Sequence, residues 1–112
     1  ILFGQGDKEQ AKAIVDEILK IDEYNTDALL RRAAFQIEAE EFDQAIVNLR
    51  NVIDNNPDSY KAMVLMSAAF ERQDNLSFAQ AELAKAFETA FELILFKGTK
   101  VQFFENLGRK QV

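Results

Sequence analysis

The sequence predicts an all-α fold, built as a solenoid of antiparallel helix pairs. Only five of its 112 residues are glycine or proline, so few positions favour turns between elements. Apolar residues recur at the three-and-four spacing of one helix face, most clearly over residues 42–53. The sequence also matches itself with a regular 34-residue period, which is typical of stacked helical units.

Three apolar columns carry this 34-residue period. Small residues fill the first column, as close approach of two helices requires, and mostly larger aliphatic residues fill the others. The columns are Ala11, Ala45 and Ala79; Val15, Leu49 and Leu83; and Ile18, Val52 and Ala86. Apolar residues at helical spacing also precede the second and third copies, over residues 29–37 and 63–70. Each unit is therefore predicted to be a pair of helices.

Capping residues and the single proline predict where the helices of these units begin and end. Asn25 and Ser59 lie one period apart and can bond the free amides of a first helical turn, so each is expected to begin a pair. Pro57 lacks an amide donor and restricts the residue before it, so it ends the preceding helix. Glu23 and Phe91 take its place in the other units, so no proline marks those boundaries.

The arrangement of Ala45, Leu49, Val52 and Pro57, with Ala33 in the preceding helix, resembles the tetratricopeptide repeat. This resemblance implies a right-handed solenoid in which each helix packs only on its neighbours. It divides the chain into the second half of a repeat (1–24), two repeats (25–58 and 59–92), and a first helix of a further repeat or a capping helix (93–112).

The carboxyl-terminal segment leaves two alternatives open. Phe104 lies one period after Phe70, and Gly108 lies three periods after Gly6, which favours a separate helix at about 95–107. Both glycines would then lie at the turn inside a helix pair.

In the alternative, the helix that starts near Ser77 continues to Phe96, and Thr99 caps a short final helix. The chain begins with Ile1 rather than methionine, so we also expect it to be a segment of a longer protein.

The composition argues against several classes of function. A net charge of −6 disfavours nucleic acid and anionic membranes as partners. The absence of cysteine and histidine removes the usual metal, haem and general-base chemistry, so we expect neither a cofactor nor an enzyme. The acidic residues at 38–43 are interpreted as a solvated turn. The longest apolar run, at 93–96, is too short to span a membrane.

The resemblance implies a scaffold that binds a peptide or a helix of a partner protein in a concave groove lined by the first helices of the pairs. By the resemblance, the groove residues here are Asp27, Leu30, Arg31, Ala34, Ile37, Lys61, Val64, Ala68, Glu71 and Arg72. Apolar members suit an apolar anchor, and the cations suit a carboxylate. Two alternatives are a merely solvated inner face and a regulatory or substrate-docking arm of a larger enzyme, such as a glycosyltransferase.

Self-association is a further expectation, because a terminal helix of an array lacks one neighbour and exposes an apolar stripe. The two predicted stripes are Ile14, Val15, Ile18 and Leu19, and Phe103, Phe104 and Leu107. Head-to-tail contact between these stripes would form a ring or a filament.

Overall fold

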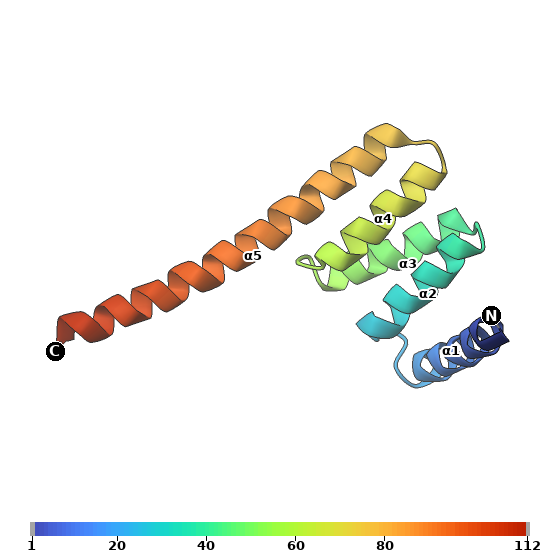
Figure 1. Cartoon of the computed structure of the whole chain (residues 1–112), viewed down its shortest axis with the longest axis horizontal. Coiled ribbons are helices and arrows are strands. Elements are labelled where there is room, and N and C mark those ends of the chain that lie inside the picture. Colours follow the sequence, from blue (N-terminus) through green and yellow to red (C-terminus); the bar gives the residue numbers. More distant parts are fainter. Residues whose placement is uncertain (1, 112) are drawn as a thin grey trace.

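A computed structural model of the protein describes the backbone of residues 2–111 and the side chains of residues 6–96 (Figure 1). Within this part the chain forms helices and no strand, which confirms the all-α prediction. The helices are α1 (Leu2–Ile21), α2 (Thr26–Glu38), α3 (Phe42–Asn55), α4 (Tyr60–Arg72) and α5 (Leu76–Gln111). No helix among the described residues is long and apolar enough to cross a membrane.

The helices stack in chain order. Each helix contacts the next one, and α2 also contacts α4, so the first helices of two consecutive pairs lie side by side. In the described part of the chain, α1 does not contact α3, and α3 does not contact α5. The chain therefore forms an elongated array in which each helix depends on its nearest neighbours, as expected for stacked repeats.

Polar caps fix the starts of α2 and α4. Asn25 Oδ1 accepts a hydrogen bond from the Ala28 amide at 2.9 Å, and Ser59 Oγ accepts one from the Ala62 amide at 3.4 Å. Both predicted caps are therefore confirmed. By contrast, the Glu41 side chain makes no capping hydrogen bond at the start of α3.

We expect Asn25→Ala to lower the free energy of unfolding by about 1 kcal/mol, because the Ala28 amide loses its partner. Glu41→Ala also removes a polar side chain at an N-cap, but this side chain makes no capping hydrogen bond. We therefore expect it to change the free energy of unfolding by less than about 0.5 kcal/mol. Urea unfolding followed by circular dichroism measures both values. Equal losses in the two variants would contradict the assigned role of the Asn25 cap.

The turns inside the two complete pairs share a backbone feature that the sequence did not reveal. Glu40 and Asp74, one period apart, have φ angles of 63° and 60°. This left-handed conformation is uncommon for residues other than glycine. The prediction that Gly6 and Gly108 mark the same turn is wrong, because Gly6 lies inside α1 and Gly108 inside α5.

The apolar columns form the core most completely in α3. Ala45 and Leu49 are fully buried, and Val52 is nearly so. In the flanking copies the burial is uneven, because Ile18 of α1 and Leu83 of α5 are exposed. The central pair is covered on both sides, and the terminal helices are covered on one side only.

The carboxyl-terminal helix differs from both expectations. Neither the separate helix at 95–107 nor the short helix capped by Thr99 forms, because α5 runs without a break from Leu76 to Gln111 and projects far beyond α4 (Figure 1). One period after Pro57 and Ser59, the chain has Phe91 and Leu93. Neither can stop a helix or cap a new one, so α5 continues.

Candidate functional site

The predicted groove residues lie on α2 and α4, and most of them are accessible. The accessible members, which we call the α2–α4 face, are Asp27, Leu30, Arg31, Ala34, Lys61, Val64, Ala68 and Glu71. Ala34 and Ala68 occupy equivalent positions of the two helices and are both half-buried. Because α2 contacts α4, the structure brings these eight side chains onto two adjoining helices.

Two predicted groove residues are engaged elsewhere. Ile37 is only 7% exposed and packs in the core, because it follows Ala33 by one helical turn on the buried side of α2. The Arg72 guanidinium lies 5.5 Å from the centre of the Phe42 ring and 3.8 Å from a carboxylate oxygen of Glu40. Ile37 is therefore removed from the set of candidate anchors, and Arg72, the last residue of α4, contacts the α2–α3 turn.

The charges of the α2–α4 face have opposite signs and lie close to apolar side chains. Asp27, Arg31, Lys61 and Glu71 are exposed and form no ion pair within the described part of the chain. Such groups can form hydrogen bonds and ion pairs with a bound peptide, while neighbouring apolar side chains supply an anchor.

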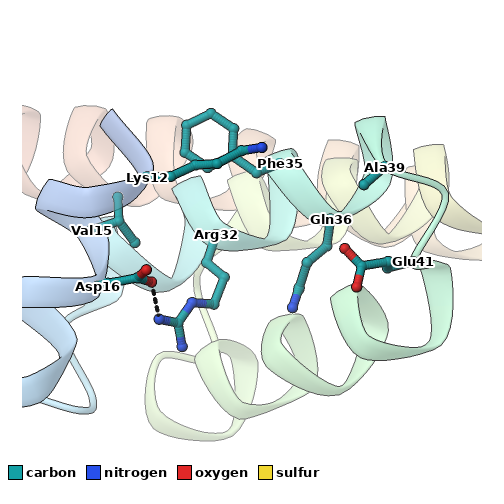
Figure 2. Close-up of a pocket in the computed structure, with 8 residues that line it drawn as sticks. All are labelled: Lys12, Val15, Asp16, Arg32, Phe35, Gln36, Ala39 and Glu41. Carbon is teal, nitrogen blue, oxygen red and sulfur yellow. Dashed lines mark hydrogen bonds and ion pairs between the residues drawn. The ribbon is translucent and has the colours of Figure 1, made fainter. Parts of the chain in front are cut away.

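A polar cleft lies between α1 and α2 (Figure 2) and has a volume of about 300 Å³. Its principal charged groups are already engaged: Arg32 Nη2 lies 2.6 Å from Asp16 Oδ1, and Lys12 Nζ lies 5.7 Å from the centre of the Phe35 ring. The cleft therefore joins α1 to α2. The sequence did not indicate these contacts, because Asp16 and Arg32 are surface residues on different helices.

Another cleft, which we call the apolar groove, lies between α4 and α5 and has a volume of about 320 Å³. Apart from the Tyr60 hydroxyl, its lining is apolar. The lining residues are Tyr60, Val64, Leu83, Ala86, Phe87, Ala90, Phe91 and Ile94. Of these residues, only Val64 belongs to the predicted groove, because a repeat boundary was expected near residue 92.

Metal binding has no candidate centre in the described region. Within that region, no three carboxylate side chains, including those of the acidic turn at 38–43, lie close enough together to hold a metal ion.

Comparison with known proteins identifies the central helix pair. A family model described as the tetratricopeptide repeat matches residues 27–59, which run from the first turn of α2 to the residue before α4. Residues 27–59 are a tetratricopeptide repeat. This repeat contains the α2–α3 pair and the proline that ends it, as the sequence pattern predicted.

Two solved structures are similar to this chain in fold. One, described as the MamA RS-1 ArsTM double mutant, has 23% identity and a TM-score of 0.65 over 81% of this chain and 51% of that chain. The other is the Yersinia enterocolitica type III secretion translocator chaperone SycD (alternative dimer), with 17% identity and a TM-score of 0.70 over 96% of this chain and 81% of that chain. The chain thus spans about half the length of the MamA chain. No curated protein matches the sequence.

Proposed function

We propose that the chain is a non-catalytic protein-interaction scaffold, which binds an extended peptide or a helix of a partner on the α2–α4 face. The observation that carries this proposal is the grouping of free charges around apolar side chains on two contacting helices. The tetratricopeptide repeat at 27–59 and the shared fold with a translocator chaperone support a scaffold in general terms.

The shape and chemistry of the α2–α4 face suit a mixed peptide. Ala34 and Ala68 are small and half-buried, so they leave room for a partner side chain. Leu30 is partly buried against the core, and Val64 lies at the edge that this face shares with the apolar groove. Arg31 lies three residues before Ala34, so the two share one face of α2, and Arg31 can pair with a carboxylate of the same ligand. A peptide with one apolar residue close to an acidic residue is therefore the ligand that this face fits best.

Selection from a displayed peptide library, followed by titration of a selected peptide, tests this proposal. We expect Arg31→Glu to weaken binding of that peptide by about tenfold or more, because it replaces an attractive charge with a repulsive one. Arg50→Glu on α3 is the matched control, since it makes the same change of charge at another exposed arginine and is expected to leave affinity unchanged.

Amide chemical-shift mapping of the bound peptide locates the site directly. Shifts centred on Leu30, Ala34 and Ala68 support binding on the α2–α4 face. Equal effects of the two arginine substitutions, or shifts confined to α1 or α5, would overturn it.

A further inference from the structure

The apolar groove beside α5 corresponds, one repeat later, to the position beside α3 that α4 fills. Leu83 and Phe87 of α5 lie one period after Leu49 and Ile53 of α3. In the α2–α3 pair, α4 packs on α3 and Leu49 is fully buried, whereas Leu83 is 48% exposed and Phe87 77% exposed. A helix placed antiparallel to α5 would therefore complete the packing that α4 provides for α3.

The exposed side chains of α5 have a spacing that suits a second copy of the same helix. Leu83, Phe87, Phe91 and Ile94 recur at intervals of four, four and three residues, and so share one helix face, which we call the α5 stripe. The stripe is nearly symmetric about residue 89. In an antiparallel pair of α5 helices, Phe87 faces the partner's Phe91 and Leu83 faces the partner's Ile94.

Charge and side-chain size are consistent with this pairing. Successive residues of a helix turn by about 100°, so Lys85 and Glu92 lie on the side of α5 opposite the stripe. Ala90 lines the apolar groove beside the stripe and is small enough to let two helices approach closely. No charged residue lines the apolar groove, so a second α5 stripe enters it without burying an unpaired charge.

The exposed area is close to what a stable dimer needs. An aromatic side chain buries about 150–250 Å², so the stripe with Tyr60 and Val64 offers roughly 600 Å² on each copy. Specific interfaces bury about 800 Å² on each partner, and Leu95, which is exposed beside the stripe, supplies part of the difference.

We propose that two copies of this chain associate through α5, with the α5 stripe of each copy seated in the apolar groove of the other. The interface is isologous, because the same surface serves both copies. It replaces the expected head-to-tail contact, because Val15 and Leu19 of the predicted α1 stripe are buried in the core and only Ile14 and Ile18 remain accessible. The side chains of Phe103, Phe104 and Leu107 lie outside the described residues.

This dimer is independent of peptide binding on the α2–α4 face. The two surfaces share only Val64, so Arg31→Glu tests the peptide site and substitutions in α5 test the dimer. Failure of one proposal leaves the other standing.

Sedimentation velocity from low to high micromolar concentration tests the dimer. We expect the native chain to shift from monomer to dimer, and Phe87→Glu to weaken association by about thirtyfold or more, since it places a charge at the centre of an apolar interface. Ile21→Glu is the matched control: Ile21 is also a highly exposed apolar residue, but it lies on α1. Circular dichroism establishes that both variants remain folded.

A crosslinking experiment tests the antiparallel arrangement. The natural chain lacks cysteine, so a single introduced thiol reports its own neighbours. We expect Ala90→Cys to form a disulfide-linked dimer on mild oxidation, because residue 90 lies near the symmetry axis. Ala81→Cys places a thiol on the opposite side of α5 and is expected to crosslink far less.

Three outcomes would overturn the proposal. The native chain could remain monomeric at every concentration. Alternatively, Ile21→Glu could disrupt association as strongly as Phe87→Glu, which would indicate head-to-tail contact through α1. Equal crosslinking at residues 90 and 81 would show that the α5 stripe does not form the interface.

Discussion

Leu49→Ala is expected to lower the free energy of unfolding by about 3–5 kcal/mol. The Leu49 side chain is fully buried in the core cluster, on a helix that α2 and α4 both contact. Truncation removes its apolar contacts and leaves a cavity that these helices can close only in part. Because domains of this size are stable by only about 5–15 kcal/mol, the loss is a large share of the total.

The matched control is Leu83→Ala, the same substitution one repeat later. Leu83 is about half exposed because no further helix packs on α5 in the part of the chain that the structure describes, so we expect a loss of about 1 kcal/mol in the monomer. Urea unfolding at low protein concentration gives both values. Similar losses in the two variants would mean that α4 does not bury Leu49 in the way the structure shows.

Phe91→Pro is expected to end α5 near residue 90. Proline in a helix interior removes a hydrogen bond, clashes with the preceding turn and costs about 3 kcal/mol or more. Phe91 lies one period after Pro57, so this substitution restores at the third boundary the residue that separates α3 from α4. Residues 91–111, about a fifth of the helical residues, are expected to lose or reorient their helix.

Far-UV circular dichroism measures this loss, and the Phe87→Glu background removes any contribution from association. Phe91→Ala is the control, because it removes the same ring without breaking the helix. The urea midpoint of the core is expected to change little, since the core cluster ends at Ala79. An unchanged helical signal in Phe91→Pro would show that α5 does not run through this position in solution.

The candidate site was predictable in part. The resemblance to the tetratricopeptide repeat predicts Asp27, Arg31 and Lys61 as groove residues, and all three are exposed on the adjoining helices α2 and α4. It misplaced Ile37, although the four-residue spacing from Ala33 could have assigned this side chain to the core. Whether the α2–α4 face binds a peptide, and whether the chain serves a larger enzyme instead, stay predictions for experiment.

Some features of this protein follow from local chemistry. The caps at Asn25 and Ser59 and the stop at Pro57 act within one or two helical turns, so residue type was enough to place these boundaries. The buried columns of α3 followed from the 34-residue period. The two caps recur one period apart, whereas the proline stop occurs only after α3.

Other features depend on which neighbours are present in space. The left-handed turns at Glu40 and Asp74 occur at residues other than glycine, so glycine positions in the sequence did not mark them. Likewise, Leu49 and Leu83 are the same residue at the same position of the repeat. One is buried and the other is exposed, because only the first has a following helix to cover it.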